Sequence, residues 1–246
     1  MQLAEYHNLA AVEHTHWWHT GMAAIAADWL RRLPGDPTCT RVLDAGCGTG
    51  GALRWLGEFG SVWGAERHPL AIDLAAQSMG RKVIRADDAA LPFRSGRFSR
   101  LTALDVLYHR EIVDDVAVLR EFARVLKPGG WLLVRVPAYN WLRGAHDEAV
   151  QTRQRYTRGE VRHKLVCAGF NPIRLTYINT LLFMPAVIWR TCQRLIGRQP
   201  ASDVRQSPAW INRLLAVVLR LECEWLRTTN LPVGLSVLAL AQKGDR

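Results

Sequence analysis

A short apolar strand that runs directly into a glycine-rich turn constrains this chain more than any other feature. Residues 42–51 read Val-Leu-Asp-Ala-Gly-Cys-Gly-Thr-Gly-Gly, and Gly46, Gly48 and Gly51 match the spacing G-x-G-x-x-G. Glycines in such a turn accept positive φ and let the backbone approach a ligand closely. The pattern therefore predicts a strand, a tight turn and a helix that together bind a nucleotide-like ligand.

Apolar runs and helical periodicity alternate along the rest of the chain. Strands are predicted at 41–45, 61–66, 82–86, 100–104, 131–136, 173–178 and 235–241, and helices at 113–126 and 157–168, among others. Residues 127–130, Lys-Pro-Gly-Gly, are predicted as a turn, because proline stops a helix and glycine permits positive φ. Strands that alternate with helices predict an α/β fold with a doubly wound, largely parallel sheet.

The composition excludes several classes of protein. The 246 residues contain 49% hydrophobic and 22% charged residues, with no apolar run of membrane-spanning length. The first ten residues do not resemble a secretory signal, and the five cysteines show neither C-x-x-C nor a pairing pattern. We therefore expect a cytoplasmic globular protein without disulfides and without a metal site. The net charge of +10 is scattered and mostly arginine, which disfavours nucleic acid as a partner.

Carboxylates stand at the ends of three predicted strands. Glu66 lies twenty residues after Gly46, where it could accept hydrogen bonds from ribose hydroxyls. Asp44 precedes the turn, where a carboxylate could meet an ammonium group and would repel a pyrophosphate. Asp87 and Asp88 follow the third strand, where they could meet an adenine edge. The structural alternative is a plain tight turn with capping carboxylates.

In combination, these segments resemble the class I S-adenosylmethionine (SAM)-dependent methyltransferases, methyltransferase type 11 group. The resemblance rests on VLDAGCGTGG, GAERHPLAIDLA, RADDAALPFRSGRFSRLTALDVLYHREIVDD and EFARVLKPGGWLLVRVP. It implies a seven-stranded Rossmann-like sheet in the order 3-2-1-4-5-7-6 with strand 7 antiparallel. It also implies SAM as cofactor and S-adenosyl-L-homocysteine (SAH) as product. One departure is Ser99, where the family usually has Asp, and we interpret it as a lost loop contact.

The resemblance also assigns cofactor-binding residues by motif position. These are Asp44, Gly46, Cys47, Gly48, Gly50, Glu66, Arg67, Asp87, Asp88, Ala89, Leu104, Asp105 and His109.

Three side chains are candidate bases for methyl transfer. His109 follows the fourth strand, where either catalysis or loop packing would explain it. His146, next to Asp147, suits a base after the fifth strand, and the alternative is an ordinary helix N-terminus. Tyr156 could orient or deprotonate a hydroxyl, or it could be a hydrogen-bonded core residue.

An aromatic cluster precedes the glycine turn. His16, Trp17 and Trp18 lie in a predicted helical lid at residues 1–40, which would touch SAM or the acceptor. Simple packing against the sheet is the alternative, and a metal site lacks a third ligand at suitable spacing. Tyr139, Arg155 and Phe183 complete the predicted acceptor-side and lid residues.

The predicted organisation places the SAM-binding core at 41–179 and the final strand at 233–246, with a helical insertion between them at 180–232. The insertion is apolar and arginine-rich, so it could form an acceptor chamber or lid, a homodimer face, a peripheral membrane contact, or a plain helical pair. The sequence thus predicts a methyltransferase for a small, largely apolar or lipid-like acceptor, with O-methylation favoured over C- or N-methylation. The alternatives are an RNA methyltransferase and a non-catalytic SAM-binding subunit.

Overall fold

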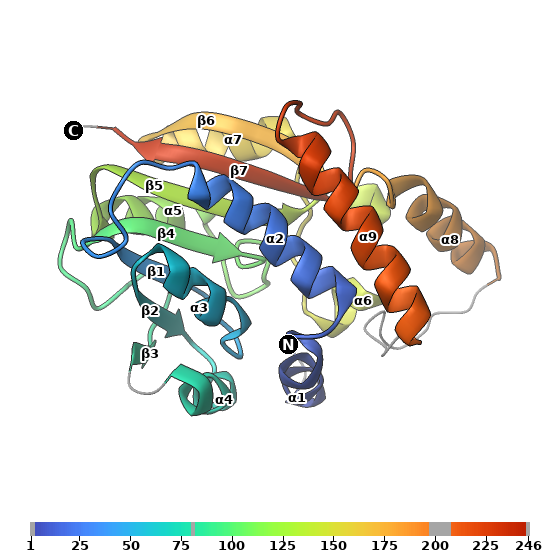
Figure 1. The fold of residues 1–246 in the computed structure, drawn as a ribbon, viewed down its shortest axis with the longest axis horizontal. Coiled ribbons are helices and arrows are strands. Elements are labelled where there is room, and N and C mark those ends of the chain that lie inside the picture. Colours follow the sequence, from blue (N-terminus) through green and yellow to red (C-terminus); the bar gives the residue numbers. More distant parts are fainter. Residues whose placement is uncertain (1–2, 80–81, 197–207, 245–246) are drawn as a thin grey trace.

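The computed structural model describes residues 3–79, 82–196 and 208–244 and forms one seven-stranded sheet (Figure 1). The strands are β1 (Arg41–Ala45), β2 (Ser61–Glu66), β3 (Val83–Arg85), β4 (Phe98–Leu104), β5 (Leu126–Pro137), β6 (Phe170–Ile178) and β7 (Ser236–Lys243). Their order is β3-β2-β1-β4-β5-β7-β6. β7 pairs antiparallel with both β5 and β6, and the remaining pairs are parallel. The predicted fold, strand order and antiparallel seventh strand are confirmed.

The helices, in chain order, are α1 (Leu3–Val12), α2 (Trp17–Arg31), α3 (Gly51–Leu56), α4 (Pro69–Met79), α5 (Asp115–Val125), α6 (Ala145–Ala149), α7 (Arg158–Cys167), α8 (Phe183–Ile196) and α9 (Ala209–Leu226). Short 3₁₀ helices occupy Gly57–Phe59 and Asn140–Leu142. The predicted insertion contains α8 and α9, with residues 197–207 between them outside the described residues.

One local prediction was wrong. Residues 127–130, predicted as a turn, lie within β5, whose residues Leu126 and Trp131 pair with Phe98 and Arg100 of β4. The chain is already extended at Leu126, where α5 ends, so the Pro-Gly run does not need to reverse the chain. It instead forms an irregularity in the register, with Gly129 at φ +70°.

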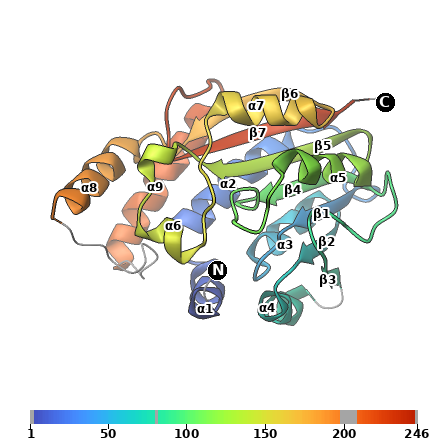
Figure 2. The same cartoon turned by 180° about the vertical axis from the view of Figure 1, so that it is seen from behind.

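Helices cover both faces of the sheet. α5 and α7 contribute Leu119, Phe122 and Leu165 to the apolar core on one face. α2 and α9 contribute Ile25 and Leu219, among others, to the core on the other face. Figures 1 and 2 show the two layers from opposite sides. These four helices therefore each bury an apolar side against the sheet or a neighbouring helix.

Helix α2, which precedes the first strand, packs against α9, which precedes the last strand. α2 lies along α9, and Arg227 at the C-cap of α9 donates to Asp28 of α2 at 3.0 Å. Arg100 of β4 donates to the carbonyls of Leu30, Leu33 and Pro34 at 3.3–3.4 Å, which fixes the C-terminal end of α2. Among the described helices, none is long and apolar enough to cross a bilayer.

Candidate cofactor and acceptor site

A cavity of about 1650 Å³ opens beyond the carboxyl ends of the parallel strands. The loops after β1, β2 and β4 line one part of it, and α2, α6 and α8 contribute to another. Ligands bind at this edge of doubly wound sheets. The cavity exceeds the roughly 300–1,000 Å³ that one small ligand usually occupies, so it has room for a cofactor and an acceptor.

The glycine turn has the geometry that its sequence predicted. Gly46, Gly48 and Gly50 have φ of +66°, +54° and +94°. A Cβ on Gly46 would lie 2.5 Å from Val106 Cγ2, so only glycine fits against the loop that follows β4. A Cβ on Gly48 would meet nothing within 4 Å, and Gly48 lines the cavity. The turn therefore presents bare backbone to the cavity at Gly48.

Gly50 serves a different purpose from the other two glycines. It is the N-cap residue of α3 and is absent from the residues that line the cavity. All other predicted cofactor-binding residues line the cavity, including Cys47, Arg67, Ala89 and Leu104. The structure thus brings that predicted set together.

Four carboxylates of the cavity lie close enough to influence one another. Burial, with a further contribution from Glu66, raises the pKa of Asp44 to about 7, although Thr102 Oγ1 donates to its carboxylate at 2.6 Å. Burial and then the charges of Glu66, Asp87 and Asp44 raise the pKa of Asp88 to about 8. These shifts reflect burial first and the repulsion between neighbouring carboxylates second.

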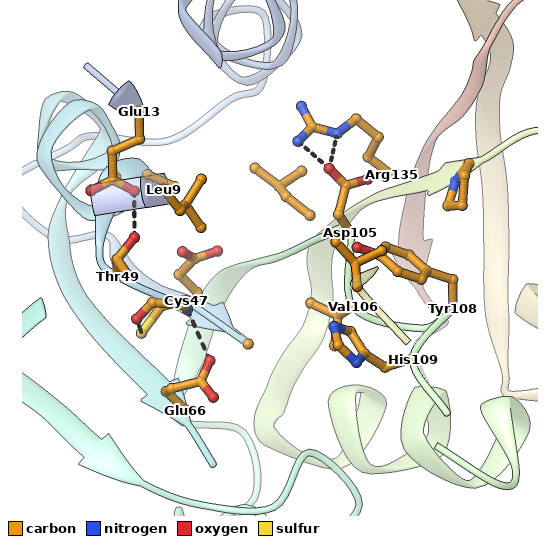
Figure 3. Close-up of a pocket in the computed structure, with 18 of the residues that line it drawn as sticks. Leu9, Glu13, Cys47, Thr49, Glu66, Asp105, Val106, Tyr108, His109 and Arg135 are labelled. Atoms are coloured by element: carbon orange, nitrogen blue, oxygen red, sulfur yellow. Dashed lines mark hydrogen bonds and ion pairs between the residues drawn. The ribbon is translucent and has the colours of Figure 1, made fainter. Parts of the chain in front are cut away.

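Glu66 is oriented by backbone amides. Its carboxylate accepts hydrogen bonds from the N–H groups of Gly48 at 2.9 Å and of Arg67 and His68 at 2.8 Å. Figure 3 shows Glu66 beside Cys47 of the turn. The carboxylate therefore joins the glycine turn to the end of β2. SAM carries an ammonium and a sulfonium. The carboxyl groups of Asp44, Glu66 and Asp88 fit this cofactor, because a nearby cation favours their deprotonated form.

Arg135 of β5 is a cavity residue that the sequence analysis missed. It is 9% exposed and donates from Nε and Nη2 to Asp105 Oδ2 at 3.0 and 2.5 Å. Asp105, at the end of β4, has a positive φ of +61°. An arginine inside a predicted apolar strand was the available signal, because such a side chain needs a buried acidic partner.

The three candidate bases lie in different surroundings. His109 lines the cavity, and burial lowers its pKa below the usual value. Figure 3 shows it across the cavity from Glu66. The side chain of His146 lies outside the described residues, although its backbone belongs to α6. Tyr156 does not line the cavity, because its hydroxyl donates to the carbonyl of Leu107 at 2.8 Å within the core.

The N-terminal segment covers the glycine turn. Thr49 Oγ1 donates to Glu13 Oε2 at 2.6 Å, and the ring of Tyr6 stacks on His68 with centroids 4.5 Å apart. Glu13 follows α1 and contacts the loop after β1, while Tyr6 of α1 contacts the loop after β2.

The aromatic cluster itself faces the cavity. His16, Trp17 and Trp18 all line it, and His16 is the N-cap of α2, with its Nδ1 accepting from Trp18 N at 3.3 Å. Trp17 N donates to Asn212 Oδ1 of α9 at 2.8 Å. The cluster is therefore held between the cavity and the insertion.

The remaining predicted acceptor residues divide into two groups. Arg155 lines the cavity and forms a buried two-bond ion pair with Asp147 at 2.7 and 3.0 Å. Tyr139 and Phe183 do not line it; their rings pack together with centroids 5.9 Å apart. The residues of α8 that do line the cavity are Ala186, Trp189 and Arg190. Within the described parts of the chain, no cluster of His, Cys, Asp or Glu could hold a metal ion.

Comparison with known proteins identifies the central part of the chain. Residues 43–134 match a family model described as "Methyltransferase domain". A demethylmenaquinone methyltransferase of Corynebacterium urealyticum is 39% identical over 107 residues, which cover 42% of this chain and 44% of that protein. A probable tRNA methyltransferase 9B of Mus musculus is 28% identical over 144 residues, 55% of this chain and 30% of that protein. The chain thus spans less than half the length of these curated relatives.

A solved structure resembles nearly the whole chain. A putative methyltransferase from Haloferax volcanii, solved in complex with the Trm112 methyltransferase activator, superposes with a TM-score of 0.64 at 21% identity. The match covers 99% of this chain and 96% of that one. Residues 43–134 therefore match a methyltransferase domain model, and the fold of the chain is the one seen in this solved structure.

Proposed function

We propose that this chain transfers the methyl group of SAM to a small, largely apolar or lipid-like acceptor, with an oxygen atom as the favoured nucleophile. The observation that carries the proposal is a cavity of about 1650 Å³ that is lined in one part by carboxylates and in another by residues of α2 and α8. We assign the first part to the cofactor and the second to the acceptor. When bound, SAM supplies a methyl group that its sulfonium already activates.

The cofactor side would hold SAM through the chain's own charges and backbone. Asp44 lies beside the glycine turn and suits the ammonium group of the methionine part. Glu66 suits the ribose hydroxyls, and Asp87 or Asp88 suits the adenine amino group, as their motif positions imply. In this arrangement the turn at Gly48 leaves the backbone free to approach the cofactor.

The acceptor side favours an apolar molecule with a polar end. Its wall includes Trp18, Val150 and Trp189, together with the basic side chains Arg155 and Arg190. These side chains come from separate segments, so the wall would exclude water when an acceptor fills it. The relative from Corynebacterium urealyticum, named for demethylmenaquinone, is consistent with a small organic acceptor.

His109 is the proposed base. It lines the cavity on the side opposite Glu66, and its lowered pKa keeps the imidazole neutral near pH 7. A neutral imidazole can accept the proton of an attacking hydroxyl. Asp105, paired with Arg135, lies between the end of β4 and the loop that carries His109 and would position that loop.

RNA is the competing acceptor. Two observations favour it, the net charge of +10 and the match to a probable tRNA methyltransferase. Against it, the wall assigned to the acceptor also contains apolar and aromatic side chains, among them Trp18, Val150 and Trp189.

One experiment separates these acceptors. The purified chain is incubated with methyl-labelled SAM and a fractionated extract of the source cells, and the label is followed. The proposal predicts label in the organic-soluble fraction. Label confined to RNA or protein would contradict the acceptor class, and SAM binding without label in any fraction would support a non-catalytic SAM-binding subunit.

A further inference from the structure

The outer face of α9 carries a row of exposed apolar side chains. Trp210, Leu214, Val217, Leu221 and Trp225 are 48–68% exposed. Their spacing of three or four residues places them on one side of the helix, and we call this row the α9 stripe. Five large apolar side chains in one row exceed the scattered exposure that a soluble surface normally shows.

The orientation of the α9 stripe is fixed by the rest of the fold. The opposite side of α9 is buried, with Leu219 and Leu226 in the core that α2 also contributes to. Asn212 Nδ2 donates to the carbonyl of Thr15 at 3.0 Å, and Arg227 bonds to Asp28 of α2 at 3.0 Å. Since these contacts hold both ends of α9, the stripe points away from α2. Figure 1 shows α9 between α2 and α8.

Positive charge runs along one edge of the α9 stripe. Arg213, Arg220 and Arg227 follow one another at intervals of seven residues, which aligns them on one side of the helix. Arg213 and Arg220 are exposed, while Arg227 is shared with Asp28 and Glu224. The chain as a whole carries +10. This row complements a surface of negative charge.

The composition of the stripe favours a lipid surface over a second copy of this chain. Trp210 and Trp225 stand at its two ends, and tryptophan prefers the boundary between headgroups and acyl chains. A helix with aromatic and aliphatic residues on one face and arginine beside them lies in the plane of a bilayer surface. Two copies of a chain of charge +10 would repel one another along the same arginine row.

The same insertion forms part of the cavity wall. Trp189 and Arg190 of α8 line the cavity, while Met184 and Ile188 of α8 are 60% and 58% exposed. A surface bound through the insertion would therefore lie near the wall of the acceptor side. This relation links the location of the chain to the class of acceptor.

We propose that the α9 stripe binds the surface of a lipid bilayer that contains anionic headgroups. This binding does not depend on methyl transfer, so its test uses no activity measurement. The full chain is sedimented with vesicles of phosphatidylcholine alone and with vesicles containing phosphatidylglycerol as well. The variant L214E/L221E places two charges in the stripe at exposed positions.

The matched control places the same charges elsewhere. Val166 of α7 and Ile173 of β6 are 56% and 50% exposed and lie outside the α9 stripe. We expect the chain to bind the anionic vesicles, L214E/L221E to bind them at least about tenfold more weakly, and V166E/I173E to bind them as the unchanged chain does. R213E/R220E is expected to weaken binding to the anionic vesicles as well.

Three results would overturn the proposal. The first is that the unchanged chain binds neither kind of vesicle. The second is that L214E/L221E and V166E/I173E bind equally well. The third is a dimer in analytical ultracentrifugation that L214E/L221E dissociates, without vesicle binding, which would assign the stripe to a second copy of the chain. Unchanged SAM affinity in each variant shows that the fold is intact.

Discussion

Glu13 and Thr49 connect the N-terminal segment directly to the glycine turn. Thr49 Oγ1 donates to Glu13 Oε2 at 2.6 Å across 36 residues of sequence. Burial raises the pKa of Glu13, while the bond from Thr49 lowers it. Because Thr49 and Glu13 both line the cavity, this contact fixes the N-terminal segment beside the site where SAM is proposed to bind.

Removal of this contact should weaken cofactor binding. E13A loses a hydrogen bond to a half-buried carboxylate, which is worth about 1.5–3 kcal/mol, so we expect a roughly tenfold or greater increase in the Kd for SAM. The measurement is isothermal titration of SAM into E13A, T49V and the double variant. A coupling free energy near zero in this cycle would show that the pair does not act as one contact.

Cofactor binding should depend on pH because of the acidic cluster. Asp44 and Asp88 have pKa values raised to about 7 and about 8, so both hold protons in part at pH 7 without a ligand. A cationic ligand favours the deprotonated carboxylates, so binding should release protons and the affinity should rise from pH 6 to pH 8. Titrations in two buffers of different ionisation enthalpy count the protons. Proton uptake on binding would contradict the assigned charges.

The buried pair of Arg155 and Asp147 should stabilise the fold. Arg155 and Asp147 side chains are 6% and 2% exposed, so R155M leaves a buried carboxylate without its partner and should cost about 3–5 kcal/mol of unfolding free energy. D147N/R155M should recover part of that loss, since no buried charge remains. Urea denaturation measures both. Equal stability of R155M and the unchanged chain would show that water already reaches Asp147.

The same pair has a consequence at low pH. Burial alone would raise the pKa of Asp147, but the hydrogen bonds and charge of Arg155 hold it below its ordinary value. A carboxyl group whose pKa is lower in the folded chain than in the unfolded chain stabilises the fold at pH values above its unfolded pKa of about 4. This stabilisation is lost as the pH falls through the pKa of the folded chain. The pH dependence of stability below pH 4 should therefore be weaker in D147N/R155M.

His109 and Tyr156 should differ in what their substitution removes. H109Q is expected to lower kcat about 10²–10⁴-fold, with little change in the affinity for SAM. Y156F removes a buried hydroxyl that bonds to Leu107 and Asp115, so it should cost about 1–2 kcal/mol of stability while the transfer rate stays near normal. Both variants are tested by measuring the rate of methyl transfer to the acceptor that the labelling experiment identifies. A normal rate in H109Q would remove His109 as the base.

The sequence predicted the sheet, and most of the residues assigned to the cofactor line the cavity, because local patterns determine both. The glycine turn and the carboxylates at strand ends form short, contiguous signals, and the strand order follows from the resemblance. Gly50 is the exception, since it was predicted to bind the cofactor but does not line the cavity. It stands next to Gly51 in the same motif, and only the backbone conformation shows that Gly50 is the N-cap of α3.

The acceptor side was harder to predict because its residues meet only through tertiary packing. Arg135 and Asp105 are 30 residues apart, so the arginine in the strand indicates a need for an acidic partner but does not identify Asp105 as that partner. Tyr156 and Arg155 are neighbours in sequence, yet Arg155 lines the cavity and Tyr156 points into the core. Adjacent residues of an extended segment face opposite sides, so the choice between them depends on register.

Direct titration of SAM into the intact chain tests the central claim most directly. We expect saturable binding at one site, competed by SAH, and its loss in G48E, whose side chain would project into the cavity. G96E is the matched control, because Gly96 also has positive φ, +66°, and open space around it, but lies outside the cavity lining. Binding that G48E retains, or that G96E loses equally, would contradict the assignment of the glycine turn as the SAM site.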